Sequence, residues 1–226
     1  MLIGQPLRVV VVGAGAMGAA AAWDLARRGC AVTLLDQFGI GNDLASSSAS
    51  ETRIFRLSHV DRADVRLAVR SLELWHELER EAGERVLYTS GLLQRGAFAL
   101  RMAEALRAEG VTVHDLDHRQ VAALFPELRP YPDTPAVVQP DGAVTLSRRA
   151  LQLYADLAAR DGAEVFGRER AIALQPRSGG VRVFTERRRV DADVAVICAG
   201  PWAGELLKPV GIDLPLEPGL AQVSYF

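Results

Sequence analysis

The stretch Leu7–Gly18, LRVVVVGAGAMG, decides the fold class of this chain. Its first half, Leu7–Val12, is a continuous apolar run rich in β-branched residues, which is typical of a strand buried on both faces of a parallel sheet. The glycine-rich half leads into Ala19–Arg28, which we expect to be a helix rich in small residues. A second apolar run, Ala31–Leu35, follows and is closed by Asp36. This order of strand, glycine turn, helix, strand and acid predicts the βαβ unit of a dinucleotide-binding domain.

The glycines of this turn follow the G-x-G-x-x-G pattern, and each has its own physical purpose. Gly13 permits the tight turn, Gly15 lets the main chain approach a pyrophosphate, and Gly18 lets the helix pack closely on the strand. The helix N-terminus presents N–H groups to the phosphates, and the acid accepts hydrogen bonds from the ribose hydroxyls. The expected cofactor-binding residues of this unit are Gly13, Gly15, Ala16, Met17, Gly18 and Asp36. Asp36 disfavours a 2′-phosphate and hence NADP, but FAD, NAD and a turn without a ligand all stay open.

The composition excludes several classes of function. The chain has 226 residues with 26 basic and 28 acidic side chains, a balance that argues against a nucleic-acid or anionic-membrane binder. No apolar run approaches the roughly 20 residues that span a bilayer. The two cysteines, Cys30 and Cys198, cannot form a disulfide framework. We therefore expect a cytoplasmic protein without a metal site.

The rest of the chain predicts alternating helices and strands. Residues 37–51 form a long loop that contains four serines, and loops of this length tend to be functional. The stretch Pro126–Pro140 holds five prolines, so we expect it to be irregular and to join two domains. The further expected helices cover 65–82, 98–109, 121–125 and 147–160, and the further expected strands cover 87–94, 162–166, 181–184, 189–190 and 193–198.

The loop and the segment after it carry a resemblance to a known family. Residues 46–59, SSSASETRIFRLSH, resemble sarcosine oxidase-like flavoenzymes of the D-amino-acid oxidase superfamily, in which a small or polar run precedes a T-R-I-x-R sequence. The GLL at 91–93, the segment 142–162 and the ICAGPW at 197–202 match as well. The resemblance implies an α/β protein, with a Rossmann-like FAD-binding domain of the glutathione-reductase type and part of an α+β substrate domain. The implied FAD-binding segments are 1–85 and 141–214, and the implied substrate-domain segments are 86–140 and 215–226.

The resemblance also implies roles for individual residues. Arg53 would lie against the flavin, and Arg56 would pair with a substrate carboxylate, for which a planar guanidinium is well suited. His59 stands where the family frequently has a tyrosine, and it could act as a proton acceptor. The implied catalytic residues are Arg53, Arg56 and His59, and the additional implied FAD contacts are Ser46, Ser47, Thr52, Arg53, Ala171, Ala199 and Gly200. The alternatives are solvated arginines on a loop and a histidine of the surface or core.

The function that the resemblance implies is FAD-dependent oxidation of a secondary amine or amino acid to an imine, with formation of hydrogen peroxide. Family members are longer than this chain, so we expect catalysis to need a C-terminal half that is absent here. A second chain or segment that completes the fold is our preferred explanation, over a truncated or proteolytic product and a degenerate protein. The alternatives are an NAD-dependent dehydrogenase and a non-catalytic FAD-binding subunit of a larger oxidoreductase.

Overall fold

The computed structural model describes residues 4–41, 47–48, 50–128 and 134–219, and it divides the chain into two compact units. Unit 1 comprises residues 1–51 and 147–226, and unit 2 comprises residues 52–146. The expected boundaries at 85 and 140 divide the FAD-binding segments from the substrate-domain segments, and this division remains a prediction. The compact units instead change at 51 and 146, because the strand and long helix after residue 51 pack within unit 2.

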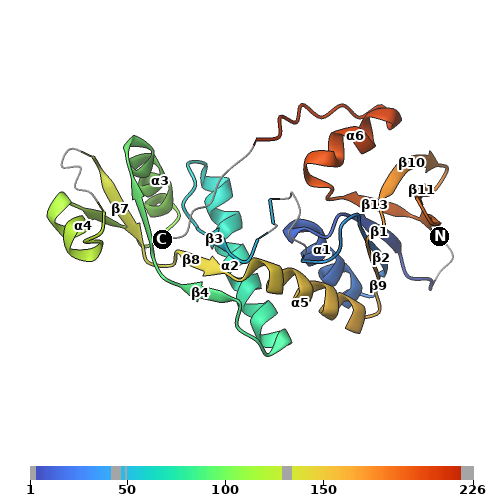
Figure 1. Cartoon of the computed structure of the whole chain (residues 1–226), viewed down its shortest axis with the longest axis horizontal. Coiled ribbons are helices and arrows are strands. Elements are labelled where there is room, and N and C mark those ends of the chain that lie inside the picture. Colours follow the sequence, from blue (N-terminus) through green and yellow to red (C-terminus); the bar gives the residue numbers. More distant parts are fainter. Residues whose placement is uncertain (1–3, 42–46, 49, 129–133, 220–226) are drawn as a thin grey trace. The chain divides into compact units, whose positions relative to one another are not determined.

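Unit 1 is built on a parallel four-stranded sheet in the order β13-β1-β2-β9 (Figure 1). The strands are β1 (Arg8–Val12), β2 (Ala31–Asp36), β9 (Glu164–Gly167) and β13 (Val194–Ile197). Each pairs in parallel with its neighbour, so that Val10 lies opposite both Thr33 and Ala195. Valine and leucine fill this sheet because both of its faces are covered. The predicted βαβ unit and the α/β fold class are confirmed.

Helices cover one face of this sheet, and a second sheet covers the other. On the first face α1 (Ala16–Arg27) lies beside α5 (Ser147–Arg160), where the rings of Trp23 and Tyr154 are 5.8 Å apart (Figure 1). The second sheet is the antiparallel β10-β11-β12, with bounds Ala171–Arg177, Gly180–Thr185 and Arg189–Ala192. Val183 of β11 packs with Val10 and Leu35 of the parallel sheet in one core cluster. The short helix α6 (Ala203–Leu207) adds Leu206 to this cluster.

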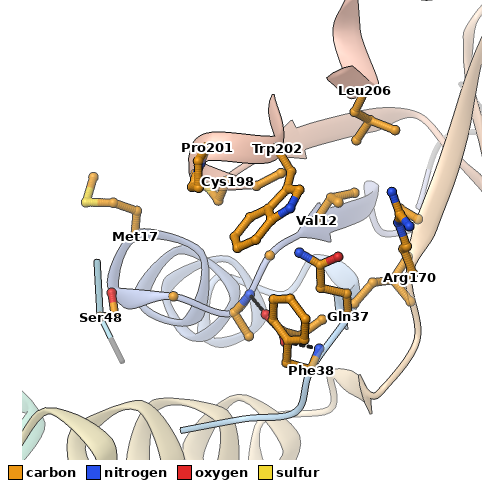
Figure 2. Close-up of a pocket in the computed structure, with 18 of the residues that line it drawn as sticks. Val12, Met17, Gln37, Phe38, Ser48, Arg170, Cys198, Pro201, Trp202 and Leu206 are labelled. Carbon is orange, nitrogen blue, oxygen red and sulfur yellow. Dashed lines mark hydrogen bonds between the residues drawn. The ribbon is translucent and has the colours of Figure 1, made fainter. Parts of the chain in front are cut away.

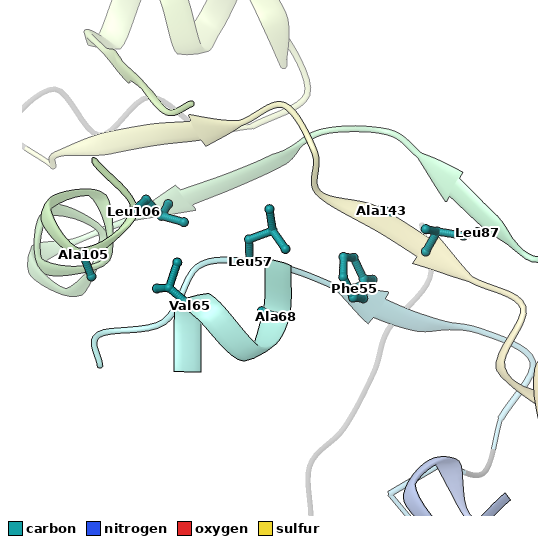
Figure 3. Close-up of a cluster of buried hydrophobic side chains, with 8 residues drawn as sticks. All are labelled: Phe55, Leu57, Val65, Ala68, Leu87, Ala105, Leu106 and Ala143. Atoms are coloured by element: carbon teal, nitrogen blue, oxygen red, sulfur yellow. The ribbon is translucent and has the colours of Figure 1, made fainter. Parts of the chain in front are cut away.

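Within its described residues, unit 2 contains two antiparallel three-stranded sheets and three helices. One sheet has the order β3-β8-β4, with bounds Arg53–Phe55, Ala143–Thr145 and Leu87–Thr89. The other has the order β5-β7-β6, with bounds Leu92–Arg95, Ala136–Gln139 and His114–Leu116. The helices are α2 (Arg62–Ala82), α3 (Ala97–Ala108) and α4 (His118–Leu124). Figure 3 shows the core, in which Leu57 lies near Val65 of α2 and Leu106 of α3, while Phe55 lies near Leu87 of β4.

Two expectations about unit 2 were wrong. The proline-rich stretch is not irregular throughout, because β7 lies inside it and is the central strand of its sheet, with Val137 fully buried. Pro135 and Pro140 flank β7 and so leave its N–H groups free to pair. The expected single strand over 87–94 is two strands of different sheets, because the chain turns at Gly91 with φ +71°.

Candidate functional site

A cavity of about 610 Å³ opens in unit 1 at the carboxyl ends of the parallel strands (Figure 2). It is lined by the β1–α1 turn, the end of β2, the link from β9 to β10, and the segment after β13. The chain leaves β1 toward β2 on one side, while β13 pairs with β1 on the other. This is a topological switch point, where open α/β sheets bind their ligands. Among the described residues, no group of three His, Cys, Asp or Glu side chains could hold a metal ion.

The three glycines of the turn have three different surroundings, as the motif predicts. Gly13 has φ +99°, and a Cβ built on it would lie 2.8 Å from the carbonyl carbon of Cys198 and closer still to its oxygen. A Cβ on Gly18 would meet the Gly13 oxygen and would lie 3.0 Å from the Cβ of Cys198. A Cβ on Gly15 would meet only the Ser48 side chain, at 3.4 Å. Gly13 and Gly18 therefore serve the fold, whereas Gly15 keeps the surface of the turn open.

The serine loop adds a hydroxyl to the N-terminus of α1. The Ala16 N–H donates to Ser48 Oγ at 3.0 Å, and both Ser47 and Ser48 line the cavity. Ser46, which we expected beside the phosphates, lies outside the described residues. Ser48 was missed because three consecutive serines give no sequence signal for which hydroxyl reaches the turn. The exposed Met17 also lines the cavity, whereas Gly18 lies behind it.

Asp36 holds the glycine turn and its own loop together. Its Oδ2 accepts the Ala14 N–H at 2.8 Å, and its Oδ1 accepts the N–H groups of Phe38 and Gly39 at 2.8 and 3.0 Å. A carboxylate has about four acceptor positions, so these bonds leave capacity for a ribose hydroxyl. The sequence predicted the ribose contact but not this structural role.

An aromatic pair borders the cavity. The rings of Phe38 and Trp202 are 5.4 Å apart at 65°, an edge-on arrangement, and lie near each other in Figure 2. Ala171, Ala199 and Gly200, which we expected at the adenine end, line the same cavity. These two aromatic residues are candidates for the site, although the sequence pattern assigned them only to the core or to a loop.

An ion pair and a thiol also border this cavity. Arg170 and Glu205 form an ion pair of 3.1 Å at its exposed rim. Burial raises the pKa of the Cys198 thiol, so this side chain stays protonated and acts as a packing group. The cavity thus combines a phosphate-type cradle with an apolar, aromatic end.

The expected catalytic residues all lie in unit 2, at or near β3. The Arg53 Nη1 donates to the Thr52 carbonyl oxygen at 2.9 Å, and Arg53 is half-buried. Arg56 is exposed directly after the strand, and His59 is half-buried. The structure therefore brings Thr52, Arg53, Arg56 and His59 together on one segment, while their place beside a flavin remains a prediction.

A buried glutamine fixes the backbone of this segment. Gln139 of β7 is fully buried, and its Oε1 accepts the Leu57 N–H at 3.1 Å. The sequence did not indicate this contact, because the two residues lie far apart in the chain and meet only through the sheet.

Residues 8–226 match the family described as DAO, FAD dependent oxidoreductase. The chain belongs to this family. Monomeric sarcosine oxidase from Streptomyces avermitilis is 35% identical over 225 residues, which cover 96% of this chain and 57% of the relative. Monomeric sarcosine oxidase from Bacillus sp. strain B-0618 is 31% identical over 224 residues, with the same coverage of 96% and 57%. The chain thus spans about half the length of the curated relatives it matches.

Solved structures agree with this membership. The open form of a variant of NikD, an unusual amino acid oxidase essential for nikkomycin biosynthesis, is 28% identical to this chain and superposes with a TM-score of 0.80. It covers 91% of this chain and 54% of its own length. The family decides between the dinucleotides that the glycine turn left open: the cofactor is FAD. In the part of the chain that the structure describes, no helix is long and apolar enough to cross a membrane.

Proposed function

We propose that this chain holds FAD in the cavity of unit 1 and takes part in the oxidation of an amine or amino acid. The observation that supports the cofactor site most directly is the turn at Gly15. Because glycine has no Cβ, the main chain there stays open to a ligand beside the N-terminus of α1. Such a terminus attracts phosphate through its N–H groups and its partial positive charge.

Different residues of the chain would bind different parts of the cofactor. The glycine turn with Ser47 and Ser48 would bind the phosphates, and Asp36 would bind the ribose. The cavity end beside Phe38 and Trp202 would take the adenine, because aromatic and apolar side chains suit a flat base. The expected FAD-binding segments 1–85 and 141–214 belong to this proposal.

The arginines of unit 2 would serve the substrate side. When bound, the flavin ring supplies the two-electron oxidation of the amine C–N bond. Arg56, exposed and able to form two parallel hydrogen bonds, would bind a substrate carboxylate. Arg53 would place a positive charge at the flavin, and His59 would accept the amine proton.

We further propose dioxygen as the electron acceptor. In balance, R₂CH–NHR′ and O₂ give R₂C=NR′ and H₂O₂, and water then hydrolyses the imine. A further segment or a complementary chain would supply the rest of the active site, because the chain spans 57% of the sarcosine oxidases it matches. Small amines and amino acids are the substrate class that the sarcosine oxidase and amino acid oxidase relatives support.

The test is the visible spectrum of the purified protein, alone and with any chain that co-purifies. We expect a flavin spectrum that bleaches when sarcosine or another small amine is added without oxygen, and hydrogen peroxide when air is admitted. Arg56→Gln should raise KM for substrates with a carboxylate more than for simple amines, with Arg80→Gln on the surface of α2 as control. Retained flavin without bleaching would favour a non-catalytic FAD-binding subunit, and a colourless protein that binds NAD would refute the proposal.

A further inference from the structure

The segment 56–59 carries two of the proposed functional residues outside any helix or strand. It follows the end of β3 and precedes the start of α2. Arg56 is exposed and His59 is half-buried, whereas Leu57 and Ser58 between them are 2% and 0% exposed. Buried backbone groups that lie outside a sheet need other hydrogen-bond partners. Side chains from other elements must therefore hold this segment in place.

Gln139 of β7 reaches this segment from inside the core. Its side chain is fully buried, and its Oε1 accepts the Leu57 N–H at 3.1 Å. Its Nε2 is also buried and makes no hydrogen bond with the described residues, and the same holds for the hydroxyl of Ser58. Buried polar groups without a protein partner are costly, and an ordered water is their usual partner. The two groups belong to the glutamine that holds Leu57 and to the residue that follows Leu57.

We infer that Gln139 is a positioning residue for Arg56, and that a buried water molecule joins its Nε2 to the Ser58 hydroxyl. This inference rests on the proposed function, in which Arg56 binds the substrate carboxylate. The water accepts the Nε2–H and bonds to the hydroxyl, which can donate or accept. The glutamine thereby fixes the two residues that directly follow Arg56, one through Oε1 and the other through the water.

The direction of Arg56 depends on this anchor. Its exposed guanidinium forms no ion pair or hydrogen bond within the part of the chain that the structure describes. The Arg53 guanidinium, by contrast, donates to the Thr52 carbonyl oxygen at 2.9 Å. The reach of an unpaired arginine follows from the position of its backbone, and two parallel hydrogen bonds to a carboxylate require close placement. A shift of the backbone at Leu57 therefore weakens the binding of a carboxylate.

Kinetics with two substrates separate positioning from a structural role. The variant Gln139→Met keeps the length of the side chain and removes both of its polar atoms. We expect it to raise KM for sarcosine about tenfold or more, which is the cost of losing a hydrogen bond to a charged group. For dimethylamine, which has no carboxylate, KM (or the inhibition constant if it is not oxidised) should change by less than about twofold. A purely structural role would reduce the turnover of both amines alike, and equal changes with the two amines would overturn the inference.

Gln94→Met is the matched control. Gln94 of the neighbouring strand β5 shares the sheet face of Gln139, and its Oε1 is likewise buried without a described partner. Its Nε2 donates to the Met102 Sδ of α3 at 2.8 Å, so Gln94→Met should leave the ratio of the two constants unchanged. Ser58→Ala keeps the Leu57 hydrogen bond but removes a partner of the water, and it should raise KM for sarcosine about threefold. An unchanged KM for sarcosine in Ser58→Ala would overturn the bridging water.

The wild-type protein decides the question even if Gln139→Met fails to fold. A crystal structure of the purified protein, with any chain that co-purifies, should show a water within about 3.2 Å of both Gln139 Nε2 and Ser58 Oγ. A direct bond between these two atoms, or side chains that point apart, would overturn the inference. Flavin bleaching by sarcosine tests the proposed function separately. Bleaching with an unselective Gln139→Met variant refutes only this inference, and the bridging water without bleaching refutes only amine oxidation.

Discussion

The glycine turn permits a paired experiment in which one substitution damages the fold and its neighbour damages binding. In Gly18→Ala the new Cβ would meet the Gly13 carbonyl oxygen and would lie 3.0 Å from the Cys198 Cβ. Because the obstacle is backbone, a rotamer change cannot relieve the overlap, and the first turn of α1 must move away from β1. In Gly15→Ala the new Cβ meets only the Ser48 hydroxyl at 3.4 Å, and φ is already −68°.

The structure gives the expected magnitudes. Overpacking a well-packed core costs about 1–3 kcal/mol, and an overlap with backbone belongs at the upper end. The better helix propensity of alanine returns about 1 kcal/mol, so Gly18→Ala should lower the free energy of unfolding of unit 1 by about 2 kcal/mol. For Gly15→Ala, the reduced freedom of the unfolded chain, about 0.4–1 kcal/mol, offsets a poorer N-cap. Its stability should therefore change by less than about 0.5 kcal/mol, while the Cβ blocks the approach of phosphate.

The assay is urea denaturation of the flavin-free chain, followed by tryptophan fluorescence, together with calorimetric titration of ADP. Flavin must be absent because a ligand of the folded state would add to the apparent stability. Gly15→Ala should bind ADP at least about tenfold more weakly while unfolding at the wild-type urea concentration. Wild-type stability of Gly18→Ala would refute the close packing of α1 on β1, and wild-type affinity of Gly15→Ala would refute a pyrophosphate at this turn.

Two further predictions concern unit 2. Phe55→Ala should lower the free energy of unfolding of unit 2 by about 3–5 kcal/mol in urea denaturation, because Phe55 is 9% exposed in the core. Ile54→Ala on the same strand is the control, since Ile54 is 64% exposed; an equal loss in both would contradict the assignment of the core. Burial raises the pKa of Glu79, but the N–H groups of Leu87 and Val86 and the nearby His76 outweigh it, so the pKa lies below its usual 4.5. The stability that Glu79 contributes is therefore fully present above pH 4.5 and is lost as the pH falls through the lowered pKa. The variant Glu79→Gln should have a free energy of unfolding about 1 kcal/mol lower than wild type at neutral pH, and this difference should shrink in acid. A difference that stays constant with pH would refute the reasoning.

Sequence patterns predicted the elements whose burial is regular along the chain. The strands β1 and β2 are continuous apolar runs because both faces are covered, whereas α2 shows an apolar stripe because only one of its faces packs on a core. By contrast, β10 was not predicted, since this edge strand is largely exposed and contains Pro176. The strand β7 was not predicted because prolines flank it. Proline removes a hydrogen bond of a sheet when it lies within a strand, and these prolines lie just outside the two ends of β7.

The candidate site was predictable where spacing carries the chemistry. Gly13, Gly15 and Asp36 follow from the motif, because a turn, a close approach and an end-of-strand acid each require a residue type at a fixed distance in sequence. Ser48 was not predictable, since its position depends on how the loop folds back onto the N-terminus of α1. Pairing between segments remote in sequence leaves no local signal.

The chain passes between the two units twice, and the two passages are tied together on both sides. In unit 1 the Ser147 hydroxyl donates to the Ser50 carbonyl oxygen at 2.7 Å, and Ser50 has the strained φ of 138°. In unit 2 Arg53 pairs with Thr145, whose hydroxyl donates to the Arg53 carbonyl oxygen at 3.1 Å. Each passage is therefore anchored within its own unit, at Ser50 and Ser147 in unit 1 and at Arg53 and Thr145 in unit 2.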